Sequence, residues 1–267
     1  MDLTIVAALL ALGAFTGFAA GLLGIGGGML MVPFMTMLLG QVGFPPEHVG
    51  KAAIATSLTT IVFTSLSSVR AHHARGAVRW PIVRTLAPGI LIGALAGAQI
   101  AGALPARVLA AVFGLFIGFS AIRMLGGGAP VADRALPGRA GMLAAGGLIG
   151  TISALLGAGG GFVTVPFLVR RAVPVQTAVA TSAACGLPIA LAGTLGYLWA
   201  GRHLPLPPGS AGYVYLPALA AISAASMLTA PWGARTAHAL SGATLKRIFA
   251  GLLGALASYM LWRAAVG

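Results

Sequence analysis

The residues best suited to chemistry in this chain are glycines and hydroxyl side chains that occur as two matched sets. Residues 24–28 read GIGGG and residues 157–161 read GAGGG, and a Thr-Ser pair follows each motif further along the chain. Each glycine inside a helix costs about 1 kcal/mol relative to alanine, so both motifs predict a helix break. A break that opens a new half-helix presents free backbone N–H groups and a positive dipole end, which can receive an anion.

Close helix packing is the alternative explanation for the glycines. Gly13, Gly17, Gly21 and Gly24 form a small-residue ladder that would let a neighbouring helix approach. Paired interrupted helices in a duplicated chain, however, indicate a transporter's midplane binding site. We therefore expect substrate to contact the central glycines of both motifs, which are Gly26, Gly27, Gly28, Gly159, Gly160 and Gly161.

The matched Thr-Ser pairs are the best side-chain candidates for substrate contact. They are Thr56 with Ser57 and Thr181 with Ser182. Their hydroxyls could donate hydrogen bonds to the oxygens of an oxyanion. They could equally cap a helix or bond back to a backbone carbonyl, so the sequence leaves both roles open.

The acidic and metal-binding side chains are scarce. The only acids are Asp2, Glu47 and Asp133, all near a terminus or in a loop, so no carboxylate is available within the apolar segments for cation binding or a proton relay. His72 and His73 are adjacent, but no second ligand cluster accompanies them. The sequence predicts an anionic substrate, no metal ion and no cofactor.

The composition of the chain indicates which kind of secondary structure positions these residues. Of 267 residues, 58% are hydrophobic and 7% are charged, which is too little polar surface for a soluble globule of this size. A helix needs roughly 20 apolar residues to cross a bilayer, so the chain has room for about eight to ten helical segments. The net charge of +13 is explained by basic loops that fix membrane orientation, and we expect no nucleic-acid partner.

The chain is a duplication. Residues 13–34 match 146–167 at a constant offset, 53–57 match 178–182, and 104–125 match 240–261. We therefore predict an all-α integral membrane protein of two homologous repeats, 1–125 and 140–267, joined by a cytoplasmic linker at 126–139. Each repeat has five expected helical segments: 3–23, 28–40, 51–70, 82–103 and 106–125, then 140–156, 161–171, 177–200, 213–233 and 243–264.

The second segment of each half is too short to cross the bilayer, and its path decides the symmetry. If the first two segments form a hairpin, the halves are inverted; if they form one broken crossing, the halves are parallel. The inverted arrangement places 12 of the 16 basic residues on the cytoplasmic side, whereas the parallel arrangement places 9 there. The charge distribution favours inverted repeats with both termini in the periplasm and a first helix that is retained, not cleaved.

These motifs together resemble the TauE/SafE sulfite exporter family of anion permeases. The resemblance covers nearly the whole chain and rests on both glycine motifs with their trailing Val-Pro-Phe, the loop 73–80, the stretch 206–217 and residues 245–250. It implies a multi-pass transporter of the bacterial inner membrane. It also implies export of sulfite or a small organosulfonate, with a proton as the candidate coupling ion.

Three other functions compete with a carrier that works by alternating access. A passive anion channel and an importer of a small organic acid share every feature described above. An intramembrane enzyme would need His, Asp or Glu groups within the apolar segments, which the sequence lacks, so no enzymatic activity is expected. The sequence does not specify the substrate, the direction of transport or the oligomeric state.

Overall fold

The computed structural model describes residues 3–23, 27–125, 135–236 and 242–266, which form ten helices and one short hairpin. The helices of the first half are α1 (Leu3–Leu23), α2 (Gly28–Gln41), α3 (Pro46–His73), α4 (Trp80–Ala103) and α5 (Ala106–Leu125). Those of the second half are α6 (Arg139–Leu156), α7 (Gly161–Val169), α8 (Val175–Ala200), α9 (Leu216–Thr236) and α10 (Gly242–Val266).

All ten expected segments are present, with small differences at their ends. The third helix begins at Pro46 instead of residue 51. Proline is tolerated at the first position of a helix, because the backbone N–H that it lacks would have no hydrogen-bond acceptor within the helix at that position. The start of the ninth segment, expected to be helical from residue 213, is instead a hairpin of β1 (Ser210–Ala211) and β2 (Val214–Tyr215). Gly212, with φ of 51°, makes the turn between the two strands.

The helices have the length and surface of a multi-pass membrane protein. Six helices in the described part of the chain are long and apolar enough to span a bilayer, namely α1, α3, α4, α6, α8 and α9. Large apolar side chains such as Ile122, Leu228 and Trp232 stay exposed on the outer faces, where lipid tails would cover them. The prediction of an all-α integral membrane protein is confirmed.

The second helix of each half is short. At a rise of about 1.5 Å per residue, the 14 residues of α2 and the 9 residues of α7 cover about 21 and 14 Å, less than the roughly 30 Å hydrocarbon core. Pro33 and Pro166 lie inside them and remove one helical hydrogen bond each.

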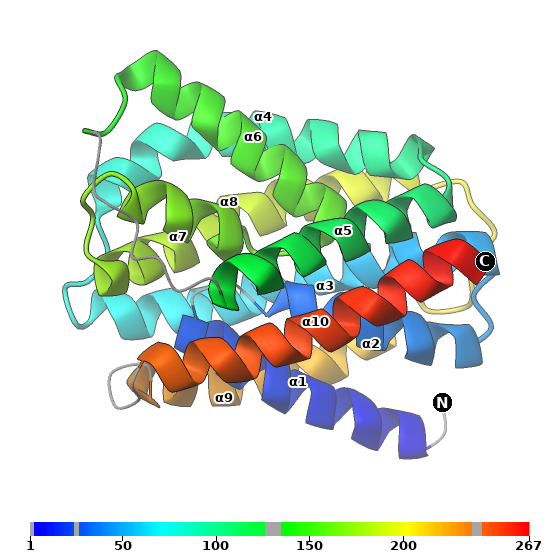
Figure 1. Cartoon of the computed structure of the whole chain (residues 1–267). Coiled ribbons are helices and arrows are strands. Elements are labelled where there is room, and N and C mark those ends of the chain that lie inside the picture. The colour runs from blue at the N-terminus through cyan, green and yellow to red at the C-terminus, as the bar shows by residue number, and fades with distance from the viewer. Residues whose placement is uncertain (1–2, 24–26, 126–134, 237–241, 267) are drawn as a thin grey trace.

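The two halves exchange contacts reciprocally around α3 and α8, which pack against each other. The first helix of each half lies against the fourth helix of the other, so α1 packs on α9 and α6 packs on α4. The fourth helices also contact the opposite central helix, α9 with α3 and α4 with α8, while α5 pairs with α10. Figure 1 shows that the equivalent helices α1 and α6 run in opposite directions across the bundle.

Small residues form the tightest of these helix pairs. A methyl group added at Gly13, Gly17 or Gly21 of α1 would overlap the backbone of α9. The corresponding glycines of α6, Gly146 and Gly150, meet the backbone of α4 in the same way. The packing role considered for the glycine ladder is therefore real at Gly13, Gly17 and Gly21, whereas Gly24 lies outside the described residues.

Candidate functional site

Both half-helices begin in the same unusual backbone conformation. Gly27 precedes α2 with φ of 73°, and Gly160 precedes α7 with φ of 75°. Side chains disfavour this left-handed region, so glycine is required at both positions. The first amides of each helix have no acceptor within their own helix, which leaves them available to another partner. The candidate residue Gly26 lies outside the described residues.

The two glycine motifs meet at the centre of the molecule. A methyl group at Gly28 would overlap the carbonyl oxygen of Gly157, so no side chain can be accommodated between them. The Ser57 hydroxyl lies 3.0 Å from the Gly157 carbonyl oxygen and 3.4 Å from that of Gly28. Ser57 therefore joins a residue of the first motif to a residue of the second.

Thr56 and Thr181 have equivalent contacts that the sequence did not reveal. The Thr56 hydroxyl oxygen accepts a hydrogen bond from the backbone N–H of Tyr215 at 3.0 Å, and Thr181 accepts one from the backbone N–H of Arg79 at 3.1 Å. Each donor lies just before the fourth helix of the opposite half. Neither threonine caps its own helix, because α3 and α8 begin several residues earlier.

The remaining candidate residues are also buried at the centre. Ser182, next to Thr181, is fully buried. Gly161 begins α7, and Gly159 lines a pocket beside the second motif. The structure therefore brings the described glycines and hydroxyls of both sets into one central region, as the duplication suggested.

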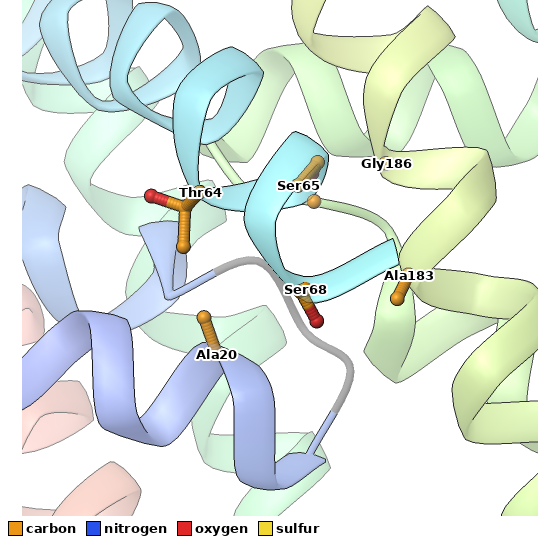
Figure 2. Close-up of a pocket in the computed structure, with 7 residues that line it drawn as sticks. Ala20, Thr64, Ser65, Ser68, Ala183 and Gly186 are labelled. Carbon is orange, nitrogen blue, oxygen red and sulfur yellow. The ribbon is translucent and has the colours of Figure 1, made fainter. Parts of the chain in front are cut away.

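A narrow pocket lies between α1, α3 and α8, beside the second glycine motif (Figure 2). In this conformation it is too narrow to admit a water molecule. None of its lining residues is charged; they are Ala20, Thr64, Ser65, Ser68, Gly159, Ala183 and Gly186.

The hydroxyls of this pocket were missed by the sequence reasoning. Thr64 bonds to the Ser226 hydroxyl of α9 at 2.9 Å, whereas the Ser68 hydroxyl is buried with no hydrogen-bond partner among the described residues. The available signal was helical spacing, because Thr60, Thr64 and Ser68 follow Thr56 at intervals of four residues on one face of α3.

Two further hydroxyls are buried without partners in the described structure, both near the second motif. Ser153 of α6 and Thr164 of α7 are fully buried, and neither hydroxyl oxygen has a hydrogen-bond partner there. A methyl group at Gly160 would lie 3.1 Å from the Ser153 hydroxyl oxygen, which places this serine directly beside the break. Buried hydroxyls without partners are uncommon and require an explanation.

The basic side chains cap helix ends, away from the pocket. Lys51 donates to the Gly102 carbonyl oxygen at 2.7 Å, Arg107 to that of Ala264 at 2.6 Å, and Arg75 to that of Ala234 at 3.1 Å. Each carbonyl lies in the last turn of a helix, where a cation satisfies a free acceptor and the negative dipole end. Among the described residues no group of three His, Cys, Asp or Glu side chains could hold a metal ion.

Comparison with known proteins identifies the family. Residues 9–260 match the family described as "Sulfite exporter TauE/SafE". The chain belongs to the TauE/SafE family. It is 36% identical over 250 residues to a probable membrane transporter protein of Haemophilus influenzae, covering 92% of this chain and 94% of that protein. No solved structure matches the chain significantly.

More distant relatives of this TauE/SafE chain have the same description and length. A probable membrane transporter protein of Methanocaldococcus jannaschii is 26% identical over 259 residues, covering 95% of this chain and 94% of the relative. One of Xylella fastidiosa is 29% identical over 257 residues, covering 94% and 93%. The chain is thus a member of a membrane transporter family over its whole length.

The segments that carry the TauE/SafE resemblance contact the central hydroxyls. The loop 73–80 includes Arg79, whose backbone N–H bonds to Thr181, and the stretch 206–217 includes Tyr215, whose backbone N–H bonds to Thr56. The Val-Pro-Phe segments lie within α2 and α7. The recognisable features of the sequence thus surround the place where the two halves meet.

Proposed function

We propose that this protein is a secondary transporter that exports a small anion, such as sulfite or an organosulfonate, across the bacterial inner membrane. The observation that carries the proposal is the meeting of two glycine-initiated half-helices beside a buried pocket of hydroxyls without any acidic residue. Oxyanions accept hydrogen bonds from backbone N–H groups at the start of a helix and from hydroxyl side chains. The glycines and Thr-Ser pairs of both motifs are the proposed contact region.

The proposed mechanism is alternating access between two inverted repeats. The reciprocal contacts of α1 with α9 and of α6 with α4, together with the opposite directions of α1 and α6, support this relation (Figure 1). Inverted repeats can exchange conformations, so that a central site opens to one side and then to the other.

The closed pocket is consistent with a carrier. Because the pocket is too narrow for water here, substrate can enter only when α1, α3 and α8 separate. A continuous channel would need an open path, whereas a carrier needs a state closed to both sides. A proton is the proposed coupling ion.

The proposal is tested by flux in proteoliposomes that contain the purified full-length chain. We expect saturable uptake of radiolabelled sulfite that accelerates under an imposed proton gradient, and counterflow when unlabelled sulfite is preloaded. Liposomes without protein provide the baseline. Absence of flux for sulfite and small sulfonates would contradict the proposal, while fast flux without saturation or counterflow would indicate a channel.

A further inference from the structure

The buried hydroxyls that lack partners are distributed unequally between the two halves. Ser153 and Thr164 flank the second motif, whereas the residues at the equivalent positions of the first half are Ala20 and Met31. The constant offset that relates residues 13–34 to 146–167 fixes this correspondence. The helices beside the first motif also contain buried hydroxyls, but Thr16 and Thr36 donate to carbonyl oxygens of their own helices, so the unpartnered hydroxyls flank the second motif.

The same inequality holds for the two central helices. The offset that aligns Thr56 with Thr181 aligns Ser65 and Ser68 of α3 with Ala190 and Gly193 of α8. A methyl group at Gly186 of α8 would lie 2.9 Å from the Ser65 hydroxyl oxygen. The same offset aligns Gly186 with Ile61 and Ser65 with Ala190, so the equivalent residues of the repeat are apolar.

These four residues, Ser65, Ser68, Ser153 and Thr164, lie along the second glycine motif and the start of α7. Ser65 and Ser68 line the pocket (Figure 2), whose lining also includes Gly159. Ser153 lies beside Gly160. Thr164 is held one turn into α7, because its backbone N–H bonds to the Gly160 carbonyl oxygen at 2.8 Å. The hydroxyls of Ser68, Ser153 and Thr164 have no partner among the described residues, and a buried donor without a partner costs free energy unless a ligand uses it.

We infer that the second glycine motif holds a single oxyanion subsite, formed by Ser65, Ser68, Ser153 and Thr164, which has no counterpart at the first motif. This inference rests on the proposed transport function and specifies where the anion binds. The transport path is then asymmetric in chemistry even though the helices are arranged symmetrically.

The charge of the lining specifies the class of anion. The pocket lining has no charged side chain, and Arg75, in the turn after α3, bonds to the carbonyl end of α9. On α3, Arg70 lies two residues beyond Ser68 and His72 one turn beyond it, and neither lines the pocket. Desolvation of a dianion costs about four times that of a monoanion of equal size, and neutral hydroxyls offset little of the difference. The subsite selects small monoanions such as hydrogensulfite over dianions such as sulfate.

The test uses Ser68→Ala and Ser153→Ala in the full chain, with Ser223→Ala as the matched control. Ser223 is also buried with an unpartnered hydroxyl in the described structure, but it does not line the pocket and it lies on α9, which neither begins nor ends at a glycine motif. Uptake of radiolabelled sulfite is measured at mildly acidic pH, where hydrogensulfite predominates, in competition with unlabelled methanesulfonate or sulfate.

We expect the half-saturating sulfite concentration to rise about tenfold in each subsite variant and to stay unchanged in Ser223→Ala, since each subsite variant loses a hydrogen bond to a charged group. Methanesulfonate should compete at least tenfold better than sulfate. Without anion, the melting temperature of the subsite variants should be unchanged or higher, because an unsatisfied buried hydroxyl has been removed.

Three results would overturn the inference while leaving the transport function standing: wild-type saturation in both subsite variants, a melting temperature that falls together with flux, or equal competition by sulfate and methanesulfonate. If the wild-type chain carries no anion, the transport proposal fails instead. The subsite is then decided by the thermal shift that methanesulfonate produces in wild-type protein, which Ser68→Ala should abolish and Ser223→Ala should retain.

Discussion

At the scale of single residues, Thr56 and Thr181 have the same contact in the two halves. Each is fully buried within a central helix and accepts a backbone N–H from the segment that leads into the fourth helix of the other half. A hydroxyl that accepts such a bond keeps its own hydrogen, so a donor role toward substrate stays compatible with these contacts. Structural and substrate-binding roles must therefore be separated by stability as well as by transport.

Thr56→Val and Thr181→Val test the structural contact. Valine preserves the shape but leaves the Tyr215 or Arg79 amide without its acceptor, so each change should lower the free energy of unfolding by about 1–3 kcal/mol. Chemical unfolding in detergent micelles gives this difference. Thr60→Val is the control, because the Thr60 hydroxyl bonds only to the Thr56 carbonyl of its own helix. Unchanged stability with reduced sulfite uptake would instead assign both threonines to the substrate.

At the scale of the helices, close backbone contact explains why so many glycines lie outside the two motifs. On α4, Gly89, Gly93 and Gly97 face the backbone of α6, and a methyl group at Gly93 would overlap the Gly147 carbonyl oxygen. In lipid there is little hydrophobic gain from pairing helices, so such pairs depend on close approach and van der Waals contact.

Gly93→Ala should separate α4 from α6 and lower the free energy of unfolding by about 1–3 kcal/mol. Gly50→Ala is the matched control, since the added methyl group on α3 meets nothing within 4 Å. The control should be stabilised by up to about 1 kcal/mol, because alanine favours helix over glycine. Thermal unfolding of the two purified variants compares them directly, and equal effects would contradict the close contact.

At the scale of the whole molecule, the hydrogen bonds of two basic side chains show which helix ends lie together at each end of α3. The bond from Arg75 to the Ala234 carbonyl places the ends of α3 and α9 together, and the bond from Lys51 to the Gly102 carbonyl places the start of α3 near the end of α4. We expect the end where α3 and α9 finish to face the cytoplasm, since the proposed inverted arrangement places most basic residues on that side.

Cysteine labelling tests this orientation. Ala172→Cys, in the turn before α8, and His203→Cys, in the loop after it, put exposed thiols at opposite ends of α8. In intact bacterial cells a membrane-impermeant maleimide should label His203→Cys, and it should label Ala172→Cys only after permeabilisation. The native Cys185 is buried and serves as the unlabelled background. Labelling of Ala172→Cys alone from outside would reverse the orientation, and labelling of both would exclude a crossing by α8.

Composition and repetition determined much of this protein from the sequence alone. The apolar segments predicted the membrane helices, because a bilayer requires long apolar helices, and the matched motifs at residues 24–28 and 157–161 predicted paired breaks. The duplication also singled out the matched Thr-Ser pairs as the candidate side chains for substrate contact. These features are local or repeated, so they are visible in a linear chain.

Only the tertiary structure showed which groups face one another. The meeting of Gly28 with Gly157, the acceptance of the Tyr215 and Arg79 amides by Thr56 and Thr181, and the pocket beside Ser68 all join residues far apart in sequence. The repeat makes the halves look equivalent, yet folding places unpartnered hydroxyls around the second motif and apolar side chains at the corresponding positions of the first. Whether a buried hydroxyl has a partner depends on distance in space, which sequence spacing does not specify.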